Sequence, residues 1–428
     1  MGLYVNILMF LLFIVFTLYY VKKSFLLTFL YGLVFYQAFS ILPSLIYIEQ
    51  GILINEQGRF SFFTGATILA TFYFIFTFLI IAMSFKTFNK KRLPVFHLAF
   101  KGENIDLKIV IFIVLIAQGV LLINAALSPL PLFDSSVSRF TYWQSSRFPF
   151  LNTLLGNTAI FIPFGLGIIF PKYKKFAVLM MLVFFVYNFL IGQKFSPIFG
   201  GSFSFLLPIV FFYRENIFQI LKKNILPLLT SFLLLFGFVY YITYIKYEET
   251  RPFANIKIYE PNEAILYRIF GLQGHLMWGA TDRYVVNSDY PKSFNPADLL
   301  YGMREMMDDF AYNRANVLSA NTIGGYNFTN AYPGILLKTF PISIAIFVHT
   351  FLTIFFLALM GWILKELLIQ RSIFFSVIAY QLFNWTVYAF IMGYFHKLYP
   401  VIFFMIFYGI FIYLRKPSND LTSQKIKR

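Results

Sequence analysis

The chain has 428 residues, of which 59% are hydrophobic, 21% aromatic and only 12% charged. These values exclude an ordinary soluble protein, because no water-soluble core could bury that much apolar surface. The formal net charge of +17 would favour a nucleic acid partner in a soluble protein, but in so apolar a chain the positions of the charges decide their meaning, and we expect no nucleic acid partner. Cysteine is absent, which excludes disulfides and a cysteine nucleophile.

Apolar runs long enough to cross a bilayer recur from the first residues to about Leu414. The first of them, from Leu3 to Val21, lacks a basic start and a small-residue cleavage site, so we expect a retained helix. The pattern predicts eleven spans, at about 3–21, 24–47, 61–85, 108–126, 151–170, 175–192, 197–213, 225–245, 335–364, 372–394 and 398–414. The sequence therefore predicts a single membrane domain over residues 1–428, an all-α polytopic protein with about eleven transmembrane helices.

Basic residues gather in every second connection between these spans, for example at Lys22 and Lys23 and again at Lys90 and Lys91. By the positive-inside rule these connections face the cytoplasm, which places the N-terminus outside and the C-terminus inside. The external connections are then those near 48–60, at 127–150, at the tight turn 192–197, and at the large loop 246–334. We expect so long a loop to be partly helical and to fold over the membrane domain.

Arginine is concentrated on the predicted external side. Eight of the 13 arginines lie there, compared with six of the 22 lysines. These arginines are Arg59, Arg139, Arg147, Arg251, Arg268, Arg283, Arg304 and Arg314. A planar guanidinium suits bidentate binding of phosphate, carboxylate or sugar hydroxyls. Alternatively, these arginines pair with the ten acidic residues of the large loop and only hold it together, and the sequence leaves both interpretations open.

The densest group of candidate functional residues is Tyr267–Gly279, in the large loop. Taken as one α-helix that begins near Asn262, this segment places Arg268 and His275, seven residues apart, on one flank of an apolar stripe. An imidazole titrates near neutral pH, so His275 suits removal of a proton from a sugar hydroxyl. A single histidine is more often structural, and that alternative also stays open.

Two further candidates lie in the shorter external connections. Arg139 and Arg147 stand among aromatic and hydroxyl side chains and suit a pyrophosphate beside a sugar ring, although the same residue types also form the aromatic belt of membrane proteins. Lys194 joins two apolar helices almost without a polar spacer. A charge so placed is costly unless it has a partner, which makes it a site candidate, or else its stem extends to the lipid headgroups.

Beyond this group, Asn295 and Pro296 predict the start of a helix that lies on the membrane surface or caps the site. The sequence has no cluster of histidines and carboxylates with metal-ligand spacing, no Walker loop and no GxSxG motif. We therefore expect neither a metal nor another cofactor.

The chain resembles the Wzy-type polymerases of bacterial O-antigen and related polysaccharides. The resemblance lies in the many apolar helices and in two external loops that each carry arginine upstream of glycine: Arg139 or Arg147 before Gly156, and Arg268 before Gly279. The local segments Arg268–His275 and Gly192–Lys194 are also similar to members of that family. One departure concerns Arg139, which is separated from Gly156 by sixteen residues where some members have fifteen.

The resemblance implies a metal-independent, GT-C-like glycosyltransferase of the bacterial cytoplasmic membrane. Its donor would be a glycan on undecaprenyl pyrophosphate, its acceptor another lipid-linked repeat unit, and its protein partner a separate chain-length regulator. It implies Arg268 and His275 as catalytic residues. The other expected substrate-binding residues are Arg139, Arg147, Lys194, Gln273, Arg251, Arg283 and Tyr267.

Two other functions stay open from the sequence. An O-antigen ligase uses the same donor but transfers the glycan to lipid A core. A transporter or lipid flippase predicts charges buried through several spans and helices broken near the middle of the membrane, whereas the polar residues of this sequence gather outside the spans.

Overall fold

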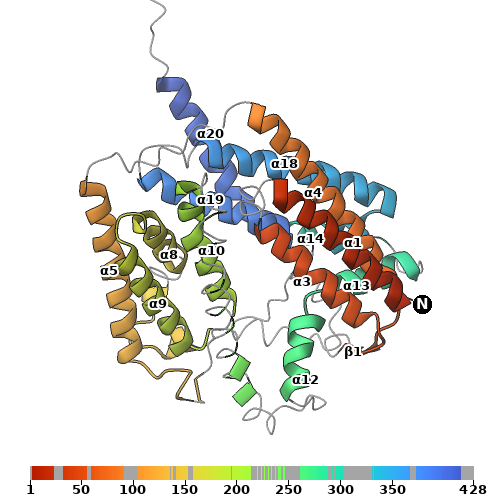
Figure 1. Cartoon of the computed structure of the whole chain (residues 1–428), viewed down its shortest axis with the longest axis horizontal. Helices are drawn as coiled ribbons and strands as arrows, with labels where there is room; N and C mark the ends of the chain where they lie inside the picture. Colours follow the sequence, from red (N-terminus) through yellow and green to blue (C-terminus); the bar gives the residue numbers. More distant parts are fainter. Residues whose placement is uncertain are drawn as a thin grey trace, which may run out of the picture.

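The computed structural model describes most of the predicted spans and part of the large loop (Figure 1). The described residues are 2–23, 32–54, 59–90, 104–134, 136–137, 141–152, 158–193, 195–213, 261–287, 292, 295–301, 330, 332–366 and 373–415, with scattered positions between 219 and 245. Within these residues the regular structure is helical, apart from two strands of two residues each.

The helices follow the chain in the order of the predicted spans. Those of the first half are α1 (Gly2–Lys23), α3 (Gly32–Ile48), α4 (Ala66–Lys90), α5 (Asn104–Ala126), α6 (Tyr142–Ser145), α8 (Thr158–Ile169), α9 (Lys174–Leu190) and α10 (Phe195–Phe212). Those of the second half are α12 (Pro261–Leu266), η3 (Tyr267–Gly271), α13 (His275–Thr281), η4 (Asp282–Val286), α14 (Pro296–Tyr301), α17 (Gly334–Thr339), α18 (Ile342–Glu366), α19 (Ile373–Met392), η5 (Phe395–Lys397) and α20 (Leu398–Arg415).

Four described helices are long and apolar enough to cross a membrane, which fits an all-α membrane protein. Their apolar stretches are Gly2–Tyr19, Ala66–Met83, Leu107–Ala126 and Ile342–Met360, and shorter apolar stretches occupy α3, α10 and α20. The expected span at 225–245 lies for the most part outside the described residues.

The start of the expected span at 335–364 is wrong, although an apolar stretch long enough to cross a membrane runs from Ile342 to Met360. The chain forms the short helix α17, leaves helical geometry at Phe340 (φ −124°, ψ 150°), and begins α18 at Ile342. Pro341 explains the break, because the ring of a proline excludes the residue before it from the α-helical region. The prediction of a helix start at Asn295 is confirmed: Asn295 Oδ1 accepts a hydrogen bond of 3.0 Å from the backbone N–H of Ala297, and α14 follows.

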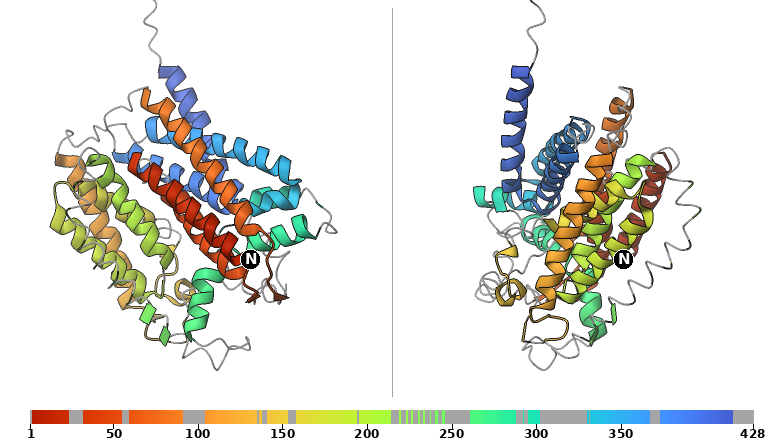
Figure 2. Two further views of the ribbon diagram at one scale, coloured as in Figure 1. Left: turned by 45° about the vertical axis from the view of Figure 1, so that its right-hand side comes forward. Right: turned by 90° about the vertical axis from the view of Figure 1, so that its left-hand side faces the viewer.

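The helices form two groups, which Figures 1 and 2 show side by side. One group contains α5, α8, α9 and α10, and the other contains α1, α3, α4, α13, α17, α18, α19 and α20. Tyr380 of α19 joins them: its ring stacks on Phe164 of α8 at a centroid distance of 4.4 Å, and its hydroxyl contacts Ser204 of α10. The second group carries the segment that holds most of the expected site.

A buried carboxylate, Glu49, fixes one end of this second group. It follows the last residue of α3 and accepts six hydrogen bonds, from Asn6 Nδ2 (2.7 Å), the N–H and hydroxyl of Thr64 (2.9 and 2.8 Å), the N–H of Ala66 (3.0 Å), and the N–H and hydroxyl of Thr67 (3.3 and 2.7 Å). These bonds satisfy free amides in the first turn of α4 and place a negative charge at its N-terminus. The start of α1, the end of α3 and the start of α4 therefore lie together.

The opposite ends of α1 and α4 carry lysine. Both helices run away from Glu49 and finish at Lys23 and Lys90. Between α3 and α4, a small hairpin pairs β1 (Leu53–Ile54) with β2 (Arg59–Phe60) in antiparallel register, with Leu53 opposite Phe60. The hairpin thus sits at the end of the bundle away from those lysines.

Candidate functional site

The segment from residue 261 to residue 287 carries most of the expected site residues, and it is not one continuous α-helix. It consists of α12, the π-helix η3, a turn at 272–274, α13 and a second π-helix, η4. The backbone N–H of Leu272 bonds to the carbonyl of Tyr267, five residues earlier, at 3.1 Å. The prediction of one α-helix across this segment is therefore wrong, and with it the α-helical spacing that placed Arg268 and His275 on a common flank.

Two close contacts at glycines explain the break. A Cβ at Gly271 would lie 2.6 Å from the ring of Tyr267, and a Cβ at Gly274 would lie 3.0 Å from both Leu45 and Ser44 of α3. The N–H of Gly274 donates a hydrogen bond of 2.8 Å to Ser44 Oγ, which in turn lies 3.3 Å from the carbonyl of Gly271. Glycine therefore lets the backbone of this segment lie directly against α3.

His275 is the first residue of α13 and is 1% exposed. Its Nδ1 lies 2.9 Å from the carbonyl oxygen of Leu272. Because a carbonyl oxygen only accepts hydrogen bonds, Nδ1 carries the proton in the neutral imidazole, and Nε2 carries the lone pair. This is the tautomer that a proton-accepting Nε2 requires.

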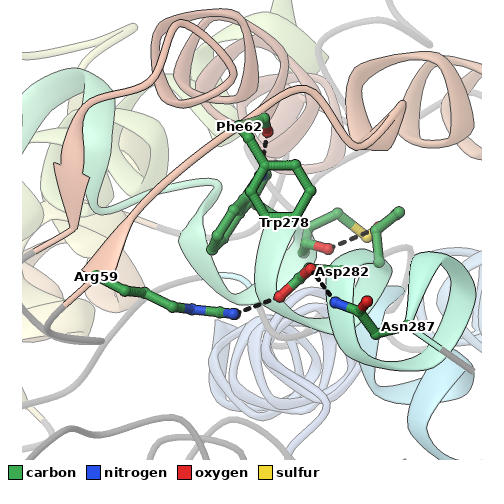
Figure 3. A network of polar contacts seen from close by, with 7 residues as sticks. Arg59, Phe62, Trp278, Asp282 and Asn287 are labelled. Carbon is green, nitrogen blue, oxygen red and sulfur yellow. Dashed lines mark hydrogen bonds and ion pairs between the residues drawn. The ribbon is translucent and has the colours of Figure 1, made fainter. Parts of the chain in front are cut away.

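An ion pair connects this segment to the hairpin between α3 and α4 (Figure 3). Arg59 Nη2 lies 2.5 Å from Asp282 Oδ2, and the guanidinium stands 4.8 Å from the ring centroid of Trp278. Asp282 is fully buried and also accepts a 2.9 Å bond from Asn287 Nδ2, while Trp278 Nε1 donates to the carbonyl of Phe62 at 2.9 Å. Arg59 therefore fits the second interpretation of the external arginines, in which they pair with acidic residues of the large loop and hold it together.

Five of the expected site residues lie on this segment, and the structure describes the side chains of four of them: Tyr267, Gln273, His275 and Arg283. Tyr267 is buried, and Arg283 is half-buried in η4, beside Asp282. Gln273 Oε1 accepts a 3.1 Å hydrogen bond from Asn330 Nδ2. Arg268 belongs to η3, but its side chain lies outside the described part of the structure.

The loop between α5 and α8 belongs to the other group of helices. Arg147 is exposed, and its N–H donates a 2.8 Å hydrogen bond to Ser128 Oγ, whose hydroxyl bonds in turn to the carbonyl of Asn124 at 2.6 Å. Nearby in the chain, the N–H and hydroxyl of Ser136 donate to Asp134 Oδ1 at 2.9 and 2.6 Å, which lowers the pKa of that carboxyl. This loop is thus anchored on α5 while the Arg147 side chain faces outward.

Three other expected site residues, Arg139, Lys194 and Arg251, lie outside the described residues, as does Gly156. Among the residues that the structure does describe, no group of three or more His, Cys, Asp or Glu side chains is arranged to hold a metal ion.

Sequence reasoning missed three residues that shape this region: Glu49, Asp282 as the partner of Arg59, and Asn330. Asn330 has a positive φ of 76°, a conformation in which asparagine is enriched among non-glycine residues. An acid directly after an apolar span was a usable signal for Glu49. The pairing of Arg59 with Asp282 joins parts of the chain too far apart for spacing to indicate it.

Comparison with known proteins places one match in this chain. Residues 296–407 match a family of unknown function, DUF6418. No curated protein and no solved structure matches the chain. The matched residues begin at α14 and end within α20, so they include α17, α18 and α19 but not α13.

Proposed function

We propose that this chain is a multi-pass glycosyltransferase of the bacterial cytoplasmic membrane that joins lipid-linked oligosaccharide repeat units into a surface polysaccharide. One observation carries the proposal. The segment with His275, Arg268 and Arg283 is seated on α3 and α4, at the end of the bundle opposite Lys23 and Lys90. A reaction on a lipid-linked sugar needs its base and cationic groups at such an end of the bundle, at or just inside the membrane boundary.

The proposal includes eleven spans, with the N-terminus outside the cytoplasm and the C-terminus inside. The contacts of Arg59 with Asp282 and of Trp278 with Phe62 support a common side for the connection near 48–60 and the large loop 246–334. The positive-inside rule then makes the lysine-bearing ends cytoplasmic and this common side external.

In the proposed reaction, the oxygen of an acceptor sugar hydroxyl attacks the anomeric carbon of the donor glycan. A new glycosidic C–O bond forms, the C–O bond to the pyrophosphate breaks, and undecaprenyl pyrophosphate leaves with the bonding electrons. His275 Nε2 takes the hydroxyl proton and passes it to water, since Nδ1–H is held by the Leu272 carbonyl. Because His275 is 1% exposed, the hydroxyl must reach Nε2 inside the protein.

The proposed reaction also requires stabilisation of the leaving pyrophosphate, which arginine can supply. The leaving pyrophosphate gains negative charge, and guanidinium groups that are already in place stabilise it without reorganisation. Arg268 and Arg283 lie on the same segment as His275, and we assign them to the pyrophosphate, together with Arg139 or Arg147 from the other group of helices. The remaining residues that we assign to substrate binding are Tyr267, Gln273, Lys194 and Arg251.

A second candidate function is transport of a lipid-linked glycan. It is favoured by the break between α17 and α18 and by the buried His349 within α18, which are features that a transporter predicts. The ligase alternative shares the chemistry proposed above and differs only in the acceptor.

Deletion of the gene in its host separates these functions. Loss of a polymerase leaves lipid A core, or the carrier lipid, with a single repeat unit. Loss of a ligase leaves core without any glycan, and loss of a transporter leaves lipid-linked units in the cytoplasmic leaflet. The proposal predicts the first pattern, and either of the others contradicts it.

Complementation then tests His275. We expect His275→Ala to accumulate normally but to leave single repeat units. His396→Ala is the matched control, because His396 Nδ1 also bonds to a backbone carbonyl, that of Leu300 at 2.7 Å, but lies between α19 and α20. Full polymer length from His275→Ala across pH 6–8 would remove His275 as the base.

A further inference from the structure

The short helices of the large loop are buried more completely than a membrane-spanning helix of the same protein. All seven residues of α13 and all six of α17 are buried. In α1, by contrast, Leu8 is 64% and Val15 66% exposed, as expected for side chains that face lipid. A Cβ at Gly334 would lie 3.3 Å from the Cα of Met277, so α17 and α13 pack closely on each other. Both helices therefore lie inside the bundle rather than over it.

Tyr332, two residues before α17, reaches well below the ends of the long helices. The Tyr332 hydroxyl lies 2.6 Å from His349 Nδ1, and the two rings stack with centroids 5.4 Å apart. His349 lies seven residues after Ile342, the start of α18, and its neighbour Tyr73 lies seven residues after Ala66, the start of α4. At a rise of roughly 1.5 Å per residue, this contact is about 10 Å inside the bundle.

The hydrogen bonds around His349 have a defined direction. The Thr77 hydroxyl donates to the Tyr73 carbonyl at 2.9 Å, so it accepts from His349 Nε2, which is also 2.9 Å away. Nε2 lies 3.2 Å from the Tyr73 carbonyl as well, and that oxygen only accepts. Nε2 therefore carries the proton, Nδ1 is the acceptor, and the Tyr332 hydroxyl is its donor.

Helix α3 holds both parts of the loop through a polar stripe, Gln37, Ser40 and Ser44, whose spacing of three and four residues places them on one face. Gln37 Nε2 donates to the carbonyl of Tyr332 at 2.9 Å, and Ser40 Oγ accepts from Asn330 Nδ2 at 3.3 Å. Ser44 bonds to the turn before α13, and Asn330 also bonds to Gln273 in that turn. The two parts of the loop are thus held by the same helix and by each other.

We propose that residues 267–287 and 332–340 form a re-entrant pair of segments within the membrane bundle, and that His349 is the positioning residue that seats them. Irregular backbone at membrane depth is tolerated where it is buried in protein, which is the environment of α13 and α17. His349 acts through Tyr332, α3 and Asn330 on the segment that carries His275. Only this last consequence, an effect on catalysis, rests on the proposed function.

The absence of cysteine allows a direct test in the full-length protein, because a single introduced thiol can be followed without background. In detergent, the probes are Leu336→Cys, in buried α17, and Gln144→Cys, at an exposed position of α6, each treated with a polar maleimide. We expect Gln144→Cys to react rapidly and Leu336→Cys to stay protected. Equally rapid labelling of both thiols would overturn the re-entrant arrangement.

The role of His349 is tested in the Leu336→Cys background. Tyr332→Phe removes the buried hydrogen bond between the Tyr332 hydroxyl and His349 Nδ1, and His349→Leu removes that bond together with those of Nε2. Both substitutions are expected to speed labelling by at least about tenfold. His349→Asn keeps an acceptor near the position of Nδ1 and is expected to retain protection. Unchanged labelling in both Tyr332→Phe and His349→Leu would refute the positioning role, and Tyr332→Phe keeps the test decisive if His349→Leu fails to fold.

Turnover of lipid-linked donor provides the second measurement. If the proposed function holds, Tyr332→Phe lowers kcat with little change in KM, because the base is displaced while donor binding remains, and His349→Asn recovers most of the rate. If the Leu336→Cys thiol is protected but the wild-type protein shows no transferase activity, the proposed function is refuted and the re-entrant arrangement stands. Transferase activity with an unprotected Leu336→Cys thiol would do the reverse.

Discussion

Replacing Glu49 by glutamine tests whether this carboxylate fixes the end of the bundle. The carboxylate oxygens receive three hydrogen bonds each, Oε1 from Thr64 and Ala66, and Oε2 from Asn6 and Thr67. Glutamine has nearly the same shape, but one of the two oxygens becomes an NH₂ group, which only donates. In either orientation of the amide, the three donors that bonded to the replaced oxygen then face the NH₂ group, which cannot accept their hydrogen bonds.

The cost follows from those bonds. A threonine hydroxyl can rotate to another acceptor. If the NH₂ group replaces Oε2, the N–H donors of Asn6 and Thr67 lose their partner; if it replaces Oε1, only the N–H of Thr64 does, because the N–H of Ala66 keeps a 3.3 Å bond to Thr64 Oγ1. Each buried donor without a partner costs about 1–3 kcal/mol. Loss of the negative charge at the N-terminus of α4 adds about 0.3–1 kcal/mol. The amide will take the less costly orientation, with one donor unsatisfied, so we expect Glu49→Gln to lower the free energy of unfolding by about 1–4 kcal/mol.

Thermal unfolding in detergent, followed by size-exclusion chromatography, measures this effect. We expect the apparent Tm of Glu49→Gln to fall by several degrees. Glu263→Gln is the matched control, because it makes the same chemical change at an exposed position of α12 and is expected to stay within about 0.5 kcal/mol of wild type. If the two variants melt at the same temperature as wild type, Glu49 does not hold α1, α3 and α4 together.

Two further substitutions probe the contacts of α13. Gly274→Ala places a Cβ 3.0 Å from side chains of α3, and we expect this overpacking to lower the free energy of unfolding by about 1–3 kcal/mol. Gly119→Ala is the control: nothing lies within 4 Å of its new Cβ, so we expect it to be neutral or slightly stabilising. Arg59→Ala leaves the carboxylate of buried Asp282 without its cation, and because Arg59 is 34% exposed we expect about 2 kcal/mol rather than the full cost of a buried pair. Asp282→Asn should lower the free energy of unfolding by less than Arg59→Ala does. The double variant Arg59→Ala/Asp282→Asn should be no less stable than Arg59→Ala alone. If the losses of the two single variants simply add in melting experiments, the two residues do not form a coupled pair.

Hydropathy was sufficient to place most of the described helices. The starts and ends of α1, α9 and α20 fall within a few residues of the expected spans, because the length of an apolar run is set by the thickness of the bilayer. Hydropathy misplaced the start of the span at 335–364, where the apolar character of α17 and α18 is continuous but Pro341 interrupts the backbone. The proline was visible in the sequence, and its effect on the preceding residue outweighs hydrophobicity.

The candidate site was harder to predict. The sequence located the segment around His275 and the arginines near it, but treated it as an external α-helix. The turn before α13 bonds to Ser44 of α3, and Tyr332, in the neighbouring part of the loop, bonds to Gln37 of α3 and His349 of α18. Polar residues spaced along an apolar helix, as in α3, are the signal that a second segment packs there, and no propensity of the large loop itself contains that information.

We propose that this chain transfers a lipid-linked glycan to a second lipid-linked repeat unit. Purified protein in liposomes that contain only undecaprenyl-pyrophosphate-linked repeat units tests it most directly, with products separated by length and released undecaprenyl pyrophosphate measured alongside. We predict glycans of two or more units, one carrier pyrophosphate released for each bond formed, and neither product from His275→Ala. Repeat units that stay single, or that only move between leaflets, would contradict the claim.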